Sequence, residues 1–241
     1  MLSKDEKNHR YSRQIILAQI GERAQARLDK AKVLCVGLGG LGCAVSLALC
    51  SIGVGYLGLV DGDEVEISNL PRQLLHQERF IETSKTLSVL YQLHHHNHET
   101  KMELYNKRIE NLQMALEISY EYDIVVDATD NARSKKILME ACEQLCKPLV
   151  IASVWQWTGI LGVYYYRGSK MNEILNQSLN QKRQLEECMG VIGVLPTLMG
   201  YFQAMEVVKM ILGLSSPLNF FHLNLLHNWT GEREIRTLGK P

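Results

Sequence analysis

The stretch Lys32-Val33-Leu34-Cys35-Val36-Gly37-Leu38-Gly39-Gly40-Leu41-Gly42 decides the fold. It begins as a short, mostly apolar and β-branched run, which predicts a buried strand over residues 32–36. Glycines follow with the spacing Gly-x-Gly-Gly-x-Gly, and small residues after them predict a helix that ends near Gly53. A glycine loop between a strand and a helix lets backbone N–H groups and a helix N-terminus face phosphate. It therefore favours nucleotide binding over a turn that only packs helix on sheet.

Strands and helices alternate along the rest of the chain. We predict helices over residues 3–15, 22–30, 44–53, 80–94, 111–120, 132–146 and 198–212. Strands are predicted over 32–36, 56–60, 102–109, 124–126, 148–152, 160–166, 219–226 and 232–238, with a long polar connection over 168–187. This alternation predicts an α/β, Rossmann-like fold, with a mainly parallel sheet, helices on both faces and an antiparallel extension near the C-terminus.

The composition is that of an ordinary globular protein. Of the 241 residues, 46% are hydrophobic and 22% are charged, which excludes wholesale disorder. Lys plus Arg and Asp plus Glu both number 26, and this balance argues against nucleic acid or an anionic membrane as a partner. No apolar run reaches the ~18 residues of a membrane helix. Five of the six cysteines lie in apolar segments, so we expect a cytoplasmic location.

No linker rich in Pro, Gly or Ser divides the chain. We therefore expect one domain over residues 1–241. It comprises N-terminal helices at 3–30, a nucleotide-binding core at 31–153, and a sheet extension, crossover segment and closing helix and strands at 154–241.

Carboxylates follow two of the predicted strands. Ligands of a parallel sheet bind beyond the carboxyl ends of its strands, which is where the glycine loop, Asp61 and the run Thr129-Asp130-Asn131 lie. Asp61 comes 19 residues after Gly42, and a carboxylate there suits hydrogen bonds to ribose hydroxyls. The alternative is that Asp61-Gly62-Asp63 only forms a turn.

Basic and polar side chains follow the second strand. Arg72 lies in the run Ser68-Asn69-Leu70-Pro71-Arg72-Gln73, and Lys85 is on the next predicted helix. A triphosphate carries about four negative charges and requires more cations than a pyrophosphate, and both residues could contact one nucleotide. Asp130 offers an oxygen ligand for Mg²⁺. Taken singly, Arg72 and Lys85 are equally explained as solvated charges, and Asp130 as a helix N-cap.

These segments together resemble the ThiF/MoeB/HesA family, the bacterial relatives of ubiquitin-activating enzymes. The likeness covers roughly residues 9 to 238. Its segments are Arg10-Tyr11-Ser12-Arg13-Gln14-Ile15-Ile16-Leu17, the glycine loop, Asp61-Gly62-Asp63, Ser68 to Gln73 with Lys85, Asp127-Ala128-Thr129-Asp130-Asn131, and the late helical segment 193–212.

The resemblance implies ATP- and Mg²⁺-dependent adenylation of the C-terminal Gly-Gly carboxylate of a ubiquitin-like sulfur-carrier protein, in thiamine, molybdopterin or related biosynthesis. By position it implies that Asp61 holds the ribose, that Asn69, Arg72, Gln73 and Lys85 hold the phosphates, and that Asp130 binds Mg²⁺. The implied ATP-binding set is completed by Gly37, Gly39, Gly40, Gly42, Asp63, Ser68 and Asn131. Arg13 matches a family arginine that reaches the triphosphate from the partner subunit, which implies a homodimer.

The sequence also departs from the family pattern. Many members hold a structural zinc ion with two Cys-x-x-Cys pairs, but the matching stretch Tyr166-Arg167-Gly168-Ser169-Lys170-Met171 has no cysteine, so we expect no structural zinc. Cys188 lies where some members carry a catalytic cysteine that bonds covalently to the carrier. The alternative is a bystander thiol at a helix entrance. Trp155 and Trp157 alternate, so we expect both on one side of an extended segment, lining a groove for a carrier tail or packing in a core.

Three other functions remain open at the level of sequence. One is adenylation of a peptide or another carboxylate in specialised biosynthesis. A second is an NAD-dependent oxidoreductase that uses the same glycine loop. The third is a non-catalytic family member that holds a carrier or a nucleotide without turnover.

Overall fold

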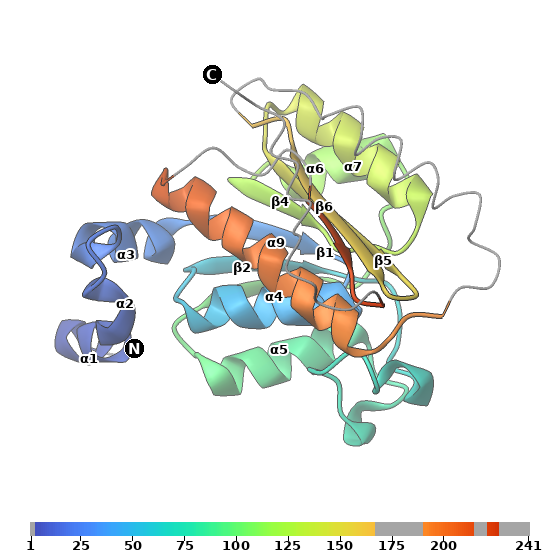
Figure 1. The fold of residues 1–241 in the computed structure, drawn as a ribbon, viewed down its shortest axis with the longest axis horizontal. Coiled ribbons are helices and arrows are strands. Elements are labelled where there is room, and N and C mark those ends of the chain that lie inside the picture. Colours follow the sequence, from blue (N-terminus) through green and yellow to red (C-terminus); the bar gives the residue numbers. More distant parts are fainter. Residues whose placement is uncertain (1–2, 167–189, 215–220, 227–241) are drawn as a thin grey trace.

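A computed structural model describes residues 3–166, 190–214 and 221–226 of the chain (Figure 1). Its described strands form a seven-stranded sheet in the order β3-β2-β1-β4-β5-β6-β7. The strands are β1 (Lys32–Val36), β2 (Tyr56–Val60), β3 (Lys101–Tyr105), β4 (Ile124–Asp127), β5 (Leu149–Trp155), β6 (Thr158–Tyr164) and β7 (Phe221–Asn224). Pairing is parallel from β3 to β5, and β6 and β7 add antiparallel strands. The predicted fold class is confirmed.

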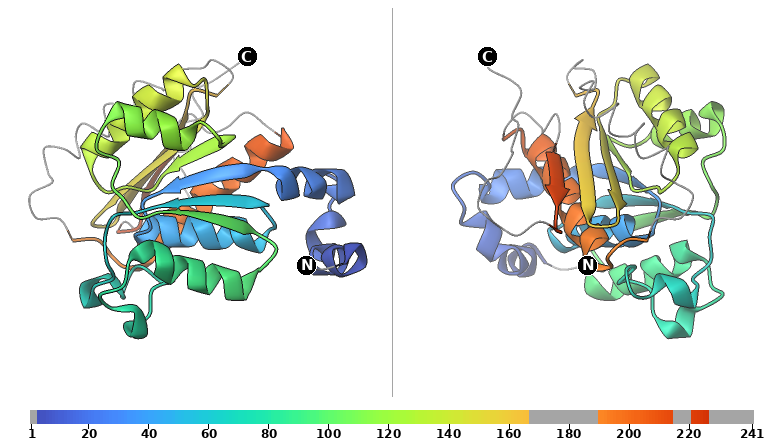
Figure 2. Two further views of the ribbon diagram at one scale, coloured as in Figure 1. Left: turned by 180° about the vertical axis from the view of Figure 1, so that it is seen from behind. Right: turned by 45° about the vertical axis from the view of Figure 1, so that its right-hand side comes forward.

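Helices cover both faces of this sheet (Figures 1 and 2). The helices are α1 (Lys4–Arg10), α2 (Ser12–Ile15), α3 (Gly21–Lys30), α4 (Gly40–Ser51), α5 (Lys85–His96), α6 (Leu112–Ser119), α7 (Ala132–Gln144) and α9 (Val194–Leu212). One apolar core joins the sheet to α4, α5 and α9, and a second core joins it to α6 and α7. The inner strands β1, β2, β4, β5 and β6 are therefore buried on both faces, as their nearly continuous apolar sequences predict, whereas the edge strand β3 keeps exposed side chains.

Helix α9 packs very closely on α4. A Cβ atom at Gly200 would lie 2.5 Å from the carbonyl oxygen of Leu41, so only a glycine permits this approach. Gln203, one turn further along α9, is fully buried and donates to the carbonyl oxygens of Asp127 (2.9 Å) and Val150 (3.3 Å). Because these carbonyls belong to β4 and β5, α9 fixes the strand ends from one face of the sheet.

Several element boundaries differ from those expected. The helix predicted over residues 3–15 is interrupted at Tyr11, because its buried ring lies over Gly53 and its hydroxyl accepts a hydrogen bond from Asn97 (3.0 Å). The helix predicted from residue 80 begins at Lys85, after a 3₁₀ turn over Glu78–Phe80.

The late helix starts four residues earlier than predicted, at Val194. Pro196 is compatible with this earlier start, because it lies in the first turn, where its backbone nitrogen needs no hydrogen bond. The strand expected over 102–109 ends at Tyr105. The strand expected over 232–238 and the connection over 168–187 lie outside the described residues. Among the residues that are described, no helix is long and apolar enough to span a membrane.

Candidate functional site

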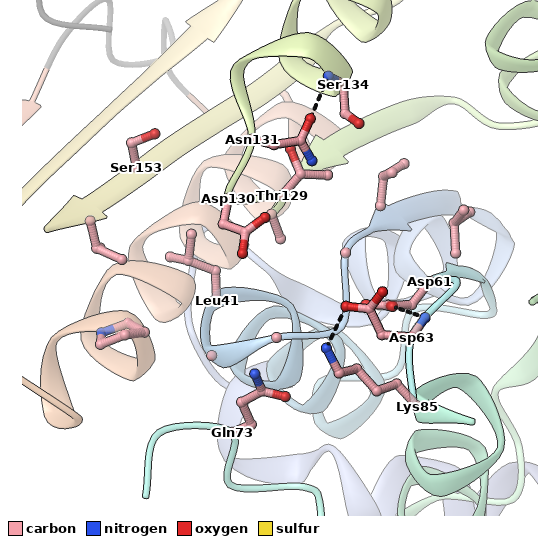
Figure 3. A pocket seen from close by; sticks show the side chains of 18 of the residues that line it. Leu41, Asp61, Asp63, Gln73, Lys85, Thr129, Asp130, Asn131, Ser134 and Ser153 are labelled. Atoms are coloured by element: carbon pink, nitrogen blue, oxygen red, sulfur yellow. Dashed lines mark hydrogen bonds and ion pairs between the residues drawn. The ribbon is translucent and has the colours of Figure 1, made fainter. Parts of the chain in front are cut away.

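A cavity of about 1000 Å³ opens beyond the carboxyl ends of the parallel strands (Figure 3). Its walls come from the ends of β1, β2, β4 and β5, the start of α4 and the loop after β3. Ten of the residues predicted from sequence line it: Gly37, Gly39, Gly40, Asp61, Asp63, Arg72, Gln73, Lys85, Asp130 and Asn131. The convergence expected from the strand ends is therefore present in the structure.

The glycine loop connects β1 to α4 with a turn that larger residues do not fit. Gly37 has φ +91°, and a Cβ atom at Gly42 would lie 1.8 Å from the carbonyl oxygen of Gly37. Gly42 thus serves the packing of the loop and does not line the cavity. Gly39 is the N-cap of α4, and no side chain caps this helix. The first N–H groups of α4 are therefore available to an anion in the cavity.

Two buried side chains hold Leu38, in the middle of this loop. Its N–H donates to Asp61 Oδ2 at 2.7 Å, and His76 Nε2 donates to its carbonyl oxygen at 3.0 Å. The Ser88 hydroxyl donates to His76 Nδ1 at 2.9 Å, which fixes the neutral imidazole. Burial lowers the pKa of His76, in agreement with this neutral form. The loop is thus pre-organised by its protein neighbours.

Asp61 lies at the end of β2, where the sequence placed it. Its Oδ1 accepts from the N–H of Asp63 at 2.8 Å, so both oxygens already take one backbone hydrogen bond. Burial raises the pKa of Asp61 above its ordinary value, because it outweighs the nearby Lys85 charge and the two backbone donors. Each oxygen keeps a further lone pair for a ligand hydroxyl.

Asp63 joins two cations at the rim of the cavity. Lys85 Nζ lies 2.9 Å from Asp63 Oδ2, and Arg108 Nη2 lies 2.6 Å from Asp63 Oδ1. Burial alone would raise the pKa of Asp63, but the hydrogen bonds from Lys85 and Arg108 outweigh it and hold this pKa below its ordinary value. The Lys85 side chain is nearly buried and lines the cavity. Its ion pair with Asp63 holds the ammonium group at the cavity wall.

Only part of the predicted segment Ser68 to Gln73 lines the cavity. Arg72 lines the cavity and donates from Nη1 to the carbonyl oxygen of Ser68 at 2.7 Å. Gln73 is buried, and its Oε1 has no hydrogen-bond partner within the described residues. Ser68 and Asn69 do not line the cavity. The Asn69 Oδ1 atom accepts a hydrogen bond from the N–H of Glu66 at 3.2 Å, and the Ser68 hydroxyl donates to the Glu66 carboxylate at 3.2 Å.

The loop after β4 presents Asp130 to the cavity. Asp130 is exposed, and within the described part of the chain its side chain makes no hydrogen bond or ion pair. Asn131 caps α7, because its Oδ1 accepts from the N–H of Ser134 at 2.8 Å. Across residues 3–166, 190–214 and 221–226, no group of three or more His, Cys, Asp and Glu side chains could hold a metal ion. One carboxylate suits Mg²⁺, which takes its other ligands from water and phosphate.

A buried ion pair between Lys135 and Asp127 lies next to this loop. Lys135 Nζ lies 3.1 Å from Asp127 Oδ2 and donates to the carbonyl oxygen of Ala152 at 3.0 Å. Asp127 Oδ1 accepts from the hydroxyl (2.7 Å) and the N–H (3.0 Å) of Thr129. The pair therefore connects α7, the end of β4 and the middle of β5 near the loop that carries Asp130.

Two sets of cavity residues were missed by the sequence reasoning. Lys107 and Arg108 lie in the loop after β3, but the strand was predicted to continue over them. Two consecutive basic residues in an apolar strand could have signalled its earlier end. Ser153 and Val154 line the cavity from β5, which was predicted to end at residue 152. Trp155 also lines the cavity, and a groove wall was one of the two alternatives expected for it. Trp157 lies in the turn after β5 and is 40% exposed, so the two tryptophans do not share one wall.

Arg13 lies far from the cavity of its own chain. It is exposed on α2, beside α3 and the amino ends of the strands, whereas the cavity opens at their carboxyl ends (Figure 1). Within one chain the structure therefore does not bring Arg13 together with the other predicted residues. Cys188 and most of the stretch compared with the zinc-binding pairs lie outside the described residues.

Curated relatives align with most of this chain. Adenylyltransferase and sulfurtransferase MOCS3 of Anopheles gambiae is 42% identical over 205 residues, which are 84% of this chain and 46% of that protein. Probable molybdopterin-synthase adenylyltransferase of Porphyra purpurea is 35% identical over 217 residues, which are 89% of this chain and 56% of that protein. The chain thus spans about half the length of the curated relatives it matches.

Solved structures share the fold. PaaA superposes with a TM-score of 0.79 at 23% identity, over 94% of this chain and 83% of PaaA. Escherichia coli MccB with ATP superposes with a TM-score of 0.75 at 24% identity, over 92% of this chain and 72% of MccB. At such identities the likeness shows the fold alone. The model of the ThiF family matches residues 11–240, nearly the whole chain, and the chain therefore belongs to the ThiF family.

Proposed function

We propose that this chain catalyses the ATP- and Mg²⁺-dependent adenylation of the C-terminal Gly-Gly carboxylate of a ubiquitin-like sulfur-carrier protein. The observation that carries the proposal is the cavity itself. There, the uncapped start of α4 faces Asp61, Asp130 and the cations Arg72, Lys85 and Arg108. Its named relatives are adenylyltransferases, two of them linked by name to sulfur transfer or molybdopterin synthase. In this proposal residues 1–241 act as one adenylation domain.

The residues present fit ATP. Asp61 would accept from the ribose hydroxyls, and its position disfavours a 2′-phosphate. The first N–H groups of α4, with Arg72, Gln73 and Lys85, would hold and neutralise the phosphates. The Gln73 side-chain N–H groups would donate to a phosphate oxygen, while its buried Oε1, which has no partner among the described residues, can only accept and therefore needs a donor other than phosphate. Gly37, Gly39 and Gly40 would form the loop that contacts the phosphates, and Gly42 permits the close packing of this loop against the start of α4.

Other residues carried over from the family would act less directly. Asn69 and Ser68 hold the Arg72 segment, and Asp63 holds Lys85 and Arg108 toward the phosphates. Asp130 would bind Mg²⁺, and Asn131 keeps the Asp130 loop at the start of α7. Bound Mg²⁺ would supply charge neutralisation to the triphosphate. A covalent role of Cys188 and the absence of structural zinc remain predictions.

The chemical step needs little acid–base help. A carboxylate is ionised at pH 7, so its oxygen can attack the α-phosphorus of ATP without a general base. The bond between the α-phosphorus and the bridging oxygen to the β-phosphate breaks, and pyrophosphate leaves with that electron pair. The products are the acyl-adenylate and pyrophosphate. Catalysis then consists of positioning the carboxylate and neutralising charge on the phosphates.

The proposal includes a homodimer in which Arg13 completes the partner's site. The distance between α2 and the cavity of the same chain supports this arrangement, since Arg13 has no route to its own site (Figure 1). Helix α9 also exposes a row of large apolar side chains: Val194 (68%), Leu198 (39%), Tyr201 (47%), Phe202 (37%) and Met205 (57%). A contiguous exposed apolar row is typical of a protein interface.

Mixing two inactive variants tests the shared site. We expect Arg13→Ala and Asp130→Ala each to be inactive alone. After subunit exchange, half of the dimers are mixed and each carries one intact site, so roughly a quarter of wild-type activity should return. Absence of recovery, with exchange verified by native mass spectrometry, would contradict the contribution of Arg13 to the partner's site.

ATP–pyrophosphate exchange tests the proposed function. The purified protein is incubated with ATP, Mg²⁺, labelled pyrophosphate and, in turn, small ubiquitin-fold proteins that end in Gly-Gly. We expect exchange that requires both the metal and one such carrier, and a carrier without its last glycine serves as the control. Exchange with short peptides alone would favour specialised peptide adenylation, and NADH binding without exchange would favour an oxidoreductase.

The proposal places the reaction in the cytoplasm.

A further inference from the structure

A buried hydroxyl without a partner lines the cavity at β5. Of the side-chain polar atoms in the described residues, six are buried without a hydrogen bond, and two of these belong to cavity residues, Gln73 and Ser153. Gln73 already has a proposed role, since its amide N–H groups would donate to the phosphates, but Ser153 has no assigned role. Ser153 is only 1% exposed. Since a buried unpaired hydroxyl costs free energy, such a group at a cavity indicates a ligand partner.

Ser153 is held rigidly in place. Lys135 donates to the carbonyl oxygen of the preceding residue, Ala152, and Gln203 donates to Val150 on the same strand. Figure 3 shows the Ser153 hydroxyl directed from β5 toward the loop that carries Asp130 and Asn131. A fixed donor of this kind loses little entropy when a ligand binds, so it can select and orient a reacting group.

The start of α7 faces the same part of the cavity. Asn131 and Ser134, the N-cap and third residue of this 13-residue helix, both line the cavity. The Asn131 Oδ1 atom accepts a hydrogen bond from the N–H of Ser134. The N–H groups of the first two helical residues still have no intrahelical partner. The positive end of a helix beside an unpaired hydroxyl suits a small anion.

The charge distribution favours a carboxylate at Ser153 over a phosphate. The cations that line the cavity, namely Arg72, Lys85, Lys107 and Arg108, come from the segments after β2 and β3 and from α5. The wall formed by β5 is uncharged, with Ser153, Val154 and Trp155. Neighbouring strands lie about 4.8 Å apart, so three strand steps put the ends of β2 and β5 about 14 Å from each other. Because no basic side chain comes from this wall, its neutral donors match a carboxylate with one negative charge better than a polyphosphate.

From this juxtaposition we propose that the Ser153 hydroxyl, with the first turn of α7, binds the C-terminal carboxylate of the acyl substrate and orients it toward the α-phosphorus. The inference rests on the proposed adenylation and adds the residue that receives the attacking group. The Ser153 hydroxyl donates a hydrogen bond to one carboxylate oxygen, and the other oxygen remains free to attack. ATP itself is held by the opposite wall and does not depend on Ser153.

Steady-state exchange kinetics of Ser153→Ala test this assignment, with Ser119→Ala as the matched control. Ser119 is also a buried serine without a hydroxyl partner in the described residues, but it lies on α6 and does not line the cavity. The probe is the Gly-Gly protein that gives the fastest exchange with the wild type. We expect Ser153→Ala to raise the KM for this carrier about tenfold or more and to leave the KM for ATP within about twofold. Ser119→Ala should change neither.

Both substitutions delete an unpaired hydroxyl, so neither should lower the melting temperature, and loss of fold is excluded by that measurement. An unchanged carrier KM in Ser153→Ala would overturn the inference. An equal rise in the KM for ATP would also overturn it, because Ser153 would then bind the nucleotide. If the wild type is active and Ser153→Ala gives either of these results, only the role of Ser153 is refuted. If the wild type itself shows no carrier-dependent exchange, the adenylation proposal is refuted, and the inference with it.

Discussion

The substitution Asp130→Ala should lower carrier-dependent ATP–pyrophosphate exchange by about 10³-fold. Asp130 is the cavity carboxylate in the loop after β4, and its side chain has no protein partner within the described residues. Removing it should take away the protein ligand of Mg²⁺, while the cradle formed by α4, Lys85 and Arg72 persists. ATP binding should therefore weaken far less than turnover.

A control on the helix that follows Asp130 separates this effect from a general loss of acidic charge. Glu140 is exposed on α7, which begins two residues after Asp130, and Glu140 does not line the cavity. Glu140→Ala should exchange at the wild-type rate, and both variants should melt at the wild-type temperature. Near-normal turnover of Asp130→Ala at limiting Mg²⁺ would refute the metal-binding role of Asp130.

The substitution Asp127→Asn should destabilise the protein by about 3 kcal/mol, because it leaves the buried Lys135 ammonium without its counter-charge. Asp127 is fully buried and Lys135 is 5% exposed, so water cannot replace the lost partner. Urea unfolding of the two proteins measures the difference. Activity should also fall, since Lys135 holds the carbonyl oxygen of Ala152 beside the cavity.

Two further variants distinguish a buried charge from a simple loss of contact. Replacing both partners, with Asp127→Asn and Lys135→Met together, should recover part of the lost stability, because no uncompensated charge remains. Glu121→Gln removes a partner of the exposed Lys32–Glu121 ion pair (3.6 Å) and should change stability by less than about 1 kcal/mol. If Asp127→Asn unfolds at the same urea concentration as Glu121→Gln, the buried pair does not stabilise the fold.

The sequence alone predicts much of this site because its residues follow strand ends. The glycine loop, Asp61 and Asp130 each come directly after an apolar strand, and parallel strands bring their carboxyl ends to one edge of the sheet. That geometric rule places the three together without any knowledge of side-chain contacts. The same rule would have found Lys107 and Arg108 if the end of β3 at Tyr105 had been recognised.

Other features depend on tertiary packing that no local pattern encodes. Asp127 and Lys135 are eight residues apart across the turn from β4 to α7, and only the folded chain brings their charges within 3.1 Å. Ser153 directly follows the apolar strand predicted over 148–152, and its lack of a partner becomes visible only when its surroundings are known. The interruption at Tyr11 likewise follows from packing against Gly53 and Asn97, which are remote in sequence.

Arg13 is a different case. The family resemblance implied that it reaches the triphosphate of the partner subunit, and Arg13 lies at the opposite end of the sheet from the cavity of its own chain. The structure of one chain does not test a contribution to a second chain. The mixing of Arg13→Ala with Asp130→Ala was chosen for this reason.

Calorimetric titration of the purified protein with ATP and Mg²⁺, and separately with NADH, tests most directly whether the cavity is built for a triphosphate. The arrangement of α4, Arg72, Lys85 and Asp130 predicts metal-dependent ATP binding with a Kd between about 1 µM and 1 mM and no heat of binding for NADH. Binding of NADH without any binding of ATP in the presence of Mg²⁺ would contradict the account.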